Sequence, residues 1–292
     1  MSNVLYDQPG PRARRRNLIG AVVAGVLLLA LVALVLRKLA AEGQFDMELW
    51  GPLIDPSTDE FPLVWGLIRQ GLTATLVAAG LAIVFSLLLG TGLGMLRMML
   101  GKYSRTPVVV WIELFRGLPV IVTIFYVYTF IRSQRIDIGF LPGDDGLWFV
   151  VIGLTLYNSV IIAEILRAGV ASLPRGQAEA GLAIGMTPRQ TMLTVQLPQA
   201  FRTMLPALIS QLVVILKDTS LAAILALYTE LLRRGNLISL NLDNPIQVLF
   251  VIGLIFIVIN YLLSKLAEFT ERRLSRSGVK PLAADTSAVP AT

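Results

Sequence analysis

Glu179-Ala180-Gly181-Leu182-Ala183-Ile184-Gly185 and, ten residues later, Val195-Gln196-Leu197-Pro198 belong to a polar, helix-forming stretch between two strongly apolar segments. This stretch is about 35 residues long and occupies the loop 167–203. Loops of such length are uncommon in compact proteins unless they have a function. The pattern therefore predicts a membrane protein in which a partner protein binds the loop 167–203 at one face of the membrane.

Local signals predict two short helices in this loop. Pro174 suits the first turn of a helix, where its missing N–H group would have no partner anyway. Gly185 can adopt the left-handed conformation that ends that helix. Thr187-Pro188-Arg189-Gln190 supplies an N-cap, a proline at the first helical position and a glutamine that completes a capping box. Pro198 is expected to interrupt the second helix.

The composition independently indicates an integral membrane protein. The 292 residues are 55% hydrophobic and 15% charged, whereas soluble proteins have about 25% charged residues. The chain has no cysteine and no histidine, which excludes thiol chemistry and removes the most common metal ligand and general base. An enzyme would have to use carboxylates, lysine, serine or threonine alone. We expect no catalytic residue, no metal site and no cofactor. The net charge of +6 comes from basic residues that flank apolar segments, which favours membrane lipid over nucleic acid as a partner.

Six apolar segments are long enough to cross a membrane, because about 20 helical residues span its hydrocarbon core. They are residues 18–36, 70–96, 107–131, 147–166, 204–231 and 246–266. We therefore predict an all-α integral membrane protein with about six transmembrane helices. The second and fifth segments are long, which favours a tilt or a kink, and Pro206 is expected to open or bend the fifth.

Basic residues give the predicted orientation. When the basic N-terminus (residues 1–17) is assigned to the cytoplasm, 16 lysines and arginines lie on that side and seven on the other. Two more, Arg116 and Lys217, fall inside apolar segments. Positively charged residues prefer the cytoplasmic side, so the opposite orientation is disfavoured. Both termini and the loop 167–203 are thus predicted to be cytoplasmic.

The first apolar segment, residues 18–36, is interpreted as an additional transmembrane helix. A secretory signal is the alternative, because basic residues precede the segment and Ala40-Ala41 follow it. The segment exceeds the ~7–15 residues of a signal core, and Arg37-Lys38 follows before any clean cleavage site. Residues 37–65 would then form an extracytoplasmic linker in which prolines oppose helix formation. Residues 271–292 are predicted to be a disordered cytoplasmic tail.

The two quoted runs resemble the signature of the permease subunits of ATP-binding-cassette (ABC) importers. That signature is E-A-A, three residues, G, nine residues and I-x-L-P, and this chain has Gly181 for the last alanine and Val195 for the isoleucine. The sequence from Ala163 to Leu221 looks most like the branch of the family that imports polar amino acids. The resemblance covers roughly residues 66–270, and it implies a five-helix permease domain there, to which this chain adds one helix.

The resemblance implies that the loop 167–203 contains a coupling helix for a separate ATPase. The residues assigned to this coupling are Glu179, Ala180, Gly181, Gly185, Val195, Leu197 and Pro198. Small side chains along the first helix permit close approach, and Glu179 supplies a charge for the partner. An amphipathic helix on lipid headgroups is the alternative, but this helix lacks the basic face and the bulky aromatic residues typical of such helices.

The resemblance also implies the partners: two ATPase subunits, a second permease subunit (a paralogue or another copy), an extracytoplasmic solute-binding protein and an amino-acid substrate. The chain itself has no phosphate loop, since Tyr103 follows its only Gly-Lys pair, Gly101-Lys102. We therefore interpret it as a non-enzymatic transport subunit in a bacterial plasma membrane. The start at Asp7-Gln8-Pro9-Gly10-Pro11, the added helix and the run Ile215–Thr219 look closest to actinobacterial glutamate permeases, which makes glutamate the leading substrate.

Lys217-Asp218-Thr219-Ser220 is expected in the middle of the fifth apolar segment and matches the K-D-T-S-L run of the amino-acid branch. A charge buried in lipid costs several kcal/mol unless it is paired or hydrated. One interpretation places these four residues in the substrate path, with Lys217 facing the carboxylate of an amino acid. The other is a buried arrangement of Lys217 and Asp218 that fixes helix packing or pairs with another subunit.

Glu113 and Arg116 are three residues apart and are expected to pair on one helix. They lie in a run, Glu113–Pro119, that resembles the E-L-F-R-G-x-P segment of the same family. Their position near the cytoplasmic end of the third apolar segment favours a structural or gate role over substrate contact. Glu164 and Arg167 have the same spacing at the end of the fourth segment, where an interfacial pair is expected.

Two other classes of function compete with this interpretation. An ion-coupled secondary transporter would need no ATPase, and it predicts internal repeats with broken helices around a midplane ion site. No convincing repeat is present, and the coupling signature would have no explanation. A membrane anchor that recruits an ATPase without transport is the third class, but it would not need polar residues inside several spans.

Overall fold

The structure is a computed structural model that describes residues 10–174 and 176–275, and all regular elements in these ranges are helical. The long helices are α1 (Pro11–Ala41), α3 (Glu60–Met99), α6 (Asp145–Ser172), α9 (Leu197–Asp218) and α12 (Pro245–Ser275). The short helices are α2 (Met47–Ile54), α4 (Thr106–Gly117), α5 (Val120–Ser133), α7 (Gly176–Ala183), α8 (Pro188–Thr191), α10 (Leu221–Leu225) and α11 (Leu231–Leu242). A π-helical turn at Met192–Gln196 joins α8 to α9. The predicted all-α fold is confirmed.

Five helical stretches are long and apolar enough to cross a membrane, and α4 with α5 would make a sixth. The prediction of about six spans is therefore confirmed for the described residues. The expectation of one continuous helix over 107–131 is wrong, because the helix direction changes by 111° between α4 and α5. Pro119 causes this break: it has no N–H group for a helical hydrogen bond, and it favours the extended backbone (ψ 141°) that Leu118 adopts.

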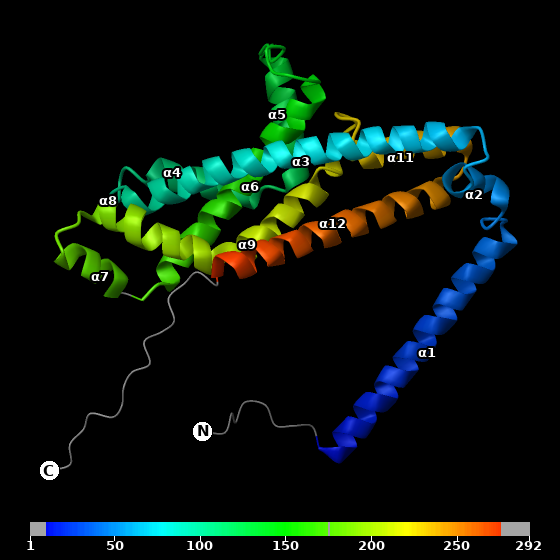
Figure 1. The fold of residues 1–292 in the computed structure, drawn as a ribbon, viewed down its shortest axis with the longest axis horizontal. Coiled ribbons are helices and arrows are strands. Elements are labelled where there is room, and N and C mark those ends of the chain that lie inside the picture. The colour runs from blue at the N-terminus through cyan, green and yellow to red at the C-terminus, as the bar shows by residue number, and fades with distance from the viewer. Residues whose placement is uncertain (1–9, 175, 276–292) are drawn as a thin grey trace.

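The helices form an elongated bundle (Figure 1). α3, α11 and α12 run along its length, α7 and α8 lie at one end, and α2 lies at the opposite end. α3 packs closely along α6 because glycines face it. A Cβ atom at Gly90 would lie 2.6 Å from the Ser159 carbonyl oxygen, and one at Gly94 would lie 3.3 Å from the Ala163 Cα atom. Small residues of this kind allow helix backbones to approach within a membrane.

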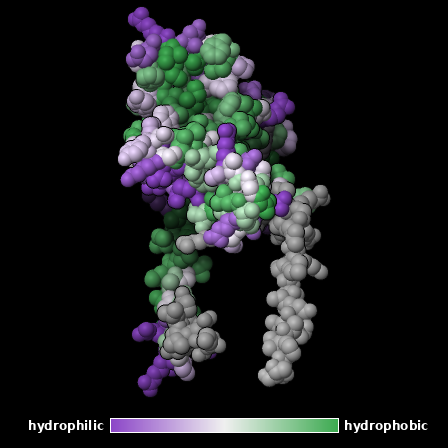
Figure 2. Space-filling model, turned by 90° about the vertical axis from the view of Figure 1, so that its left-hand side faces the viewer, coloured by the Kyte–Doolittle hydropathy of each residue, from purple (hydrophilic) through white to green (hydrophobic). Residues whose placement is uncertain are grey.

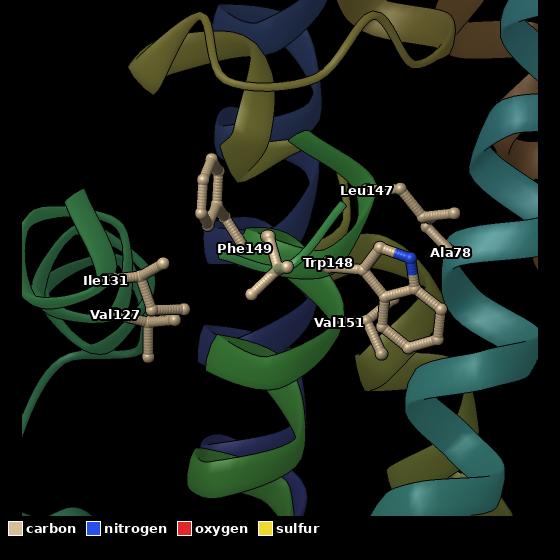
Figure 3. Close-up of a cluster of buried hydrophobic side chains, with 8 residues drawn as sticks. Ala78, Val127, Ile131, Leu147, Trp148, Phe149 and Val151 are labelled. Atoms are coloured by element: carbon tan, nitrogen blue, oxygen red, sulfur yellow. The ribbon is translucent and has the colours of Figure 1, made fainter. Parts of the chain in front are cut away.

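A hydrophobic cluster joins α3, α5 and α6 in the interior (Figure 3). Val127 and Ile131 of α5 point towards Phe149 of α6, whereas Leu147 and Trp148 lie on the side of α6 that faces Ala78 of α3. The indole nitrogen of Trp148 donates to the Pro142 carbonyl oxygen at 2.9 Å, so its one polar group has a partner. This cluster fixes the position of α5 beyond the break at Pro119.

The fifth predicted span, residues 204–231, differs from the structure at both ends. α9 begins earlier, at Leu197, and Pro198 does not interrupt it. The π-helical turn lies directly before this proline and accommodates the backbone hydrogen bond that the proline cannot donate. Pro206 lies inside α9. At the other end α9 stops at Asp218, where the side chains of Thr219 and Ser220 bond to backbone carbonyl oxygens of the last helical turn.

The segment expected to be a linker poor in helix, residues 37–65, contains α2, so that expectation is wrong. Leu53 of α2 is 2% exposed and belongs to a core cluster with α3, α11 and α12. Its carbonyl oxygen accepts a hydrogen bond from the Trp65 indole at 3.0 Å. Pro52 is tolerated because the helix is short and the burial of its apolar side offsets the lost hydrogen bond.

α1 differs from the other long helices because none of its residues is buried. It projects away from the bundle in Figure 1, and its 18-residue apolar core has a mean hydropathy of 3.0. The basic N-terminus, predicted as residues 1–17, enters this helix at Pro11. Of the predicted tail 271–292, residues 276–292 lie outside the described part of the chain.

Candidate coupling site

α7 is a largely exposed helix with a well-defined C-terminal end. Gly185 adopts the left-handed conformation (φ +86°). The amide groups of Gly185 and Met186 donate to the carbonyl oxygens of Leu182 and Gly181 at 3.0 and 3.1 Å. This is the Schellman arrangement that satisfies the last carbonyl groups of a helix. The predicted stop at Gly185 is confirmed.

The predicted capping box of α8 is also confirmed. The Gln190 amide donates to the Thr187 hydroxyl at 3.2 Å, and the Thr187 amide donates to the Gln190 side-chain oxygen at 2.8 Å. Each side chain thus satisfies a backbone amide that has no partner within the helix. The turn between α7 and α8 is therefore fixed by local hydrogen bonds.

Gly181 faces inward, against α8. It is the one buried residue of α7, and a Cβ atom there would lie 2.7 Å from Cγ2 and 2.9 Å from Oγ1 of Thr191. Small side chains of α7 were expected to permit close approach by a partner protein, but at Gly181 the close approach is made by Thr191 of the same chain. The contact has a structural role, since it holds α7 against the start of the long helix that leads to α9.

The outward side of α7 combines a carboxylate with apolar side chains. Glu179 and Ala180 are exposed, Leu182 is 49% exposed, and Ile184 after the helix is 79% exposed. In Figure 2 this end of the molecule faces the viewer and shows hydrophilic groups beside a smaller hydrophobic area. Leu182 and Ile184 were not singled out in the sequence, although large apolar residues in a polar loop are the signal that identifies them.

Two connections join α7 to the membrane-spanning helices. The Gln199 side-chain amide of α9 donates to the Gln177 side-chain oxygen of α7 at 3.0 Å. In addition, α8, the π-helical turn and α9 form one unbroken helical stretch up to Asp218. Val195 and Leu197 lie half-buried in that stretch and Pro198 is exposed. α7 is therefore linked to α9 by a side-chain hydrogen bond and through its contact with the helical stretch that begins at α8.

A cluster of charged residues lies where α3, α4 and α6 meet. Arg97 of α3 bonds to Glu164 of α6 and lies 3.9 Å from a carboxylate oxygen of Glu113 in α4. The predicted pairs Glu113–Arg116 (2.8 Å) and Glu164–Arg167 (3.0 Å) are confirmed. Arg97 was not predicted to take part. No sequence spacing indicates it, because it reaches both carboxylates across helices.

Lys217 lies in the stretch Pro188–Leu225, which is long and apolar enough to cross a membrane. It lies at the C-terminal end of α9, and its exposed side chain lines a groove of about 490 Å³ with Ser220 and with Asn260 of α12. The Asn260 side-chain oxygen is buried without a hydrogen-bond partner. Within residues 10–174 and 176–275, no salt bridge joins Lys217 to Asp218. Asp218 is half-buried and Thr219 is buried.

Residues 82–276 match the family model of the binding-protein-dependent transport system inner membrane component. The chain belongs to this family. It is a permease subunit of the ABC importer type and an integral membrane protein, which confirms the interpretation of the sequence and leaves the ion-coupled secondary transporter without support.

Individual relatives agree with this membership. The chain is 40% identical to the glutamate transport system permease protein GluD of Corynebacterium glutamicum, with 81% of this chain and 83% of the relative covered. It is 31% identical to the glutamate/aspartate import permease protein GltK of Escherichia coli, with 70% and 92% covered. It also resembles a crystal structure of an amino acid ABC transporter with histidines, with a TM-score of 0.65, 28% identity, and 74% and 99% covered.

Proposed function

We propose that this permease forms the translocation path for glutamate and couples it to ATP hydrolysis in a separate subunit. One observation supports the coupling: the exposed helix α7 is held against α8 at Gly181, and α8 begins the helical stretch that runs through the π-helical turn into α9. Closure of an ATPase dimer that binds α7 would therefore tilt α9 as a rigid body. Movement of this helix would open the path alternately to the two sides of the membrane.

The proposed complex contains two ATPase subunits, an extracytoplasmic solute-binding protein and two permease subunits. The second permease subunit is either another copy of this chain or a paralogue. We place α7 and the adjoining ends of the spans on the cytoplasmic side. Lys102, Arg105 and the charged cluster around Arg97 lie at the same end, and basic residues are enriched on that side of a membrane. The N-terminus is cytoplasmic by the same rule. Mass determination of the purified complex distinguishes the two compositions.

Glutamate as substrate is supported by the relatives and by the groove beside Lys217. GluD and GltK are named for glutamate transport or import. Lys217 lines this groove with Ser220, and its ammonium group offers a positive charge and hydrogen-bond donors to a carboxylate. The carboxylate and side chain of glutamate both carry negative charge, so a single lysine on the path favours an acidic amino acid over a basic one.

The coupling assignment is tested by reversing the charge of Glu179 to Lys in the reconstituted complex. We expect normal membrane insertion, loss of the ATPase subunit in a pull-down, and loss of the ATP hydrolysis that binding protein and glutamate stimulate. Glu42→Lys is the matched control, because Glu42 is an exposed carboxylate at the end of α1, far from α7 in Figure 1. Normal stimulated hydrolysis in Glu179→Lys would remove this assignment. A panel of amino acids in the same assay tests glutamate separately.

A further inference from the structure

A cavity of about 620 Å³ lies between the ends of α3, α4 and α6, beside the π-helical turn. Four basic residues line it: Arg97, Lys102, Arg105 and Arg167. None of the residues assigned to coupling or to the substrate path lines this cavity. It is a separate site, for which the proposed function supplies no role.

The charges of the cavity are only partly neutralised. Arg97 and Arg167 share the carboxylate of Glu164, which does not line the cavity. Lys102 and Arg105 are exposed and form no salt bridge with any residue of the described ranges. α4 begins at Thr106, which also lines the cavity, and its start has no acidic residue and no side-chain cap. Its positive end therefore adds to the field of the two free cations.

The remaining walls of the cavity are apolar. Met98, Val109, Val170 and Met192 contribute the larger side chains. On the outer surfaces of α3 and α4 the apolar character continues with Leu96, Val110 and Trp111, which are 47%, 59% and 39% exposed. Tyr103, 87% exposed, follows Lys102 directly. Tyrosine and tryptophan are enriched where a membrane meets water, so the cavity lies at the level of lipid headgroups.

We propose that this cavity binds the headgroup of an anionic phospholipid. The phosphate lies between Lys102 and Arg105 at the start of α4, and the glycerol and upper acyl chain follow the apolar wall towards Leu96 and Val110. Basic pockets between transmembrane helices on the cytoplasmic side are suited to such headgroups. A soluble anion would use the basic residues but not the apolar wall, and an acidic segment of a partner protein would not need a wall that continues into lipid-facing surface.

The bound lipid would connect α3, α4 and α6 at the end where α7 lies. Arg97 and Arg167, which line the cavity, also belong to the charged cluster that joins these three helices. Lipid binding at Lys102 and Arg105 would therefore stabilise the arrangement of helices on which α7 is mounted. The purified transporter would become more stable in anionic lipid than in zwitterionic lipid.

The test titrates the purified full complex in mild detergent with phosphatidylglycerol, phosphatidylcholine or inorganic phosphate, and follows the thermal unfolding midpoint. Phosphatidylglycerol should raise the midpoint and the other two should not. In Lys102→Gln/Arg105→Gln the apparent affinity should fall roughly thirtyfold, because two basic charges near the headgroup are lost. Arg15→Gln/Arg16→Gln is the matched control: it removes the same charge from exposed residues at the start of α1, outside the cavity, and should retain full affinity.

A second variant tests the apolar part of the site. Ala171 lines the cavity and is exposed, so Ala171→Trp should fill the space without a change of charge and weaken phosphatidylglycerol binding in the same way. An equal effect of inorganic phosphate would overturn the lipid in favour of a soluble anion. Equal losses in the cavity and control variants would overturn the site. Loss of the ATPase subunit from Lys102→Gln/Arg105→Gln with unchanged lipid affinity would assign the cavity to a protein partner instead.

Discussion

Gly181 of α7 lies directly against Thr191 of α8, so close that a methyl group at position 181 would come within 2.7 Å of the threonine Cγ2 atom. The related signature has alanine at this position. In this chain the threonine occupies the space that the extra methyl group would need. The two residues therefore act together to set the distance between the exposed helix and the helical stretch that enters the membrane.

Gly181→Ala should separate α7 from α8 and weaken coupling although it restores the signature residue. Overpacking of this kind typically costs about 1–3 kcal/mol. We expect reduced substrate-stimulated ATP hydrolysis in the reconstituted complex, with normal membrane insertion. Gly176→Ala in the same helix is the control, since a Cβ atom there meets nothing within 4 Å.

Thr191→Ala should rescue Gly181→Ala, because it removes both atoms, Cγ2 and Oγ1, that clash with the new methyl group. The Thr191 hydroxyl oxygen is buried without a hydrogen-bond partner, so its removal leaves no other group unsatisfied. Stimulated hydrolysis in the double variant that stays as low as in Gly181→Ala would show that the contact does not set the position of α7.

The features that the sequence predicted well are those with local causes. The stop at Gly185 and the capping box at Thr187 depend on residues within one turn, and the structure has both. The six spans follow from apolar runs longer than the membrane is thick. The pairs Glu113–Arg116 and Glu164–Arg167 follow from helical spacing.

The features that the sequence did not predict depend on tertiary contacts or on the balance of two local effects. Arg97 joins the charged cluster only because α3, α4 and α6 meet there. α2 forms despite Pro52 because Leu53 is buried against other helices. Pro198 was expected to end a helix, but a π-helical turn before it accommodates the missing donor. Propensity alone cannot decide between such outcomes.

Ile184→Ser should weaken binding of the ATPase subunit. A large apolar side chain that is 79% exposed in the free chain has the most surface to bury when a partner binds, and such central contacts can contribute about 2 kcal/mol or more. We therefore expect at least tenfold weaker binding in a pull-down titration. Leu240→Ser is the matched control, because Leu240 of α11 is 75% exposed and lies at the opposite end of the bundle. Equal affinity in the two variants would exclude Ile184 from the interface.

Arg97→Gln should destabilise the meeting point of α3, α4 and α6. The side chains of Arg97 and Glu164 are 18% and 17% exposed, so removal of the arginine leaves a largely buried carboxylate with Arg167 as its remaining partner. We expect a loss of about 1–3 kcal/mol in the free energy of unfolding. Thermal unfolding in detergent measures it, and Arg97→Gln/Glu164→Gln should recover part of the loss.

Arg116→Gln is the control for this experiment. Arg116 pairs with Glu113 at 2.8 Å, but their side chains are 52% and 46% exposed. Exposed pairs contribute about 0–1 kcal/mol. If Arg116→Gln lowers the free energy of unfolding as much as Arg97→Gln does, the contact of Arg97 across helices contributes no more to stability than an exposed pair does.

Deletion of residues 1–42 should leave the remaining protein folded and active, whereas deletion of residues 1–60 should not. α1 has no buried residue. The longer deletion also removes α2 with the core residue Leu53. It further removes Gln44, whose backbone carbonyl oxygen accepts a hydrogen bond from Gln247 of α12 at 2.6 Å. Uptake corrected for membrane abundance is the measurement, and equal uptake by both deletions would remove the role assigned to α2.

The last prediction concerns Lys217 and separates its two interpretations. Its side chain is exposed in the groove with Ser220 and Asn260, and no salt bridge ties it to Asp218 among the described residues. Lys217→Met keeps the length and the apolar stem of the side chain but removes the charge. If Lys217 faces the substrate, glutamate uptake should fall at least tenfold while assembly and basal ATP hydrolysis remain, because a charge-assisted hydrogen bond contributes about 1.5–3 kcal/mol.

If Lys217 instead neutralises Asp218 within the assembled permease pair, Lys217→Met leaves a half-buried carboxylate unpaired, and assembly should fail before transport is affected. Lys217→Met/Asp218→Asn removes both charges and distinguishes the two cases. The double variant should stay as inactive in glutamate uptake as Lys217→Met if the lysine serves the substrate, because Asp218→Asn restores no positive charge to the groove. Recovery of assembly and uptake in the double variant would instead identify a structural pair and would remove Lys217 from the substrate path.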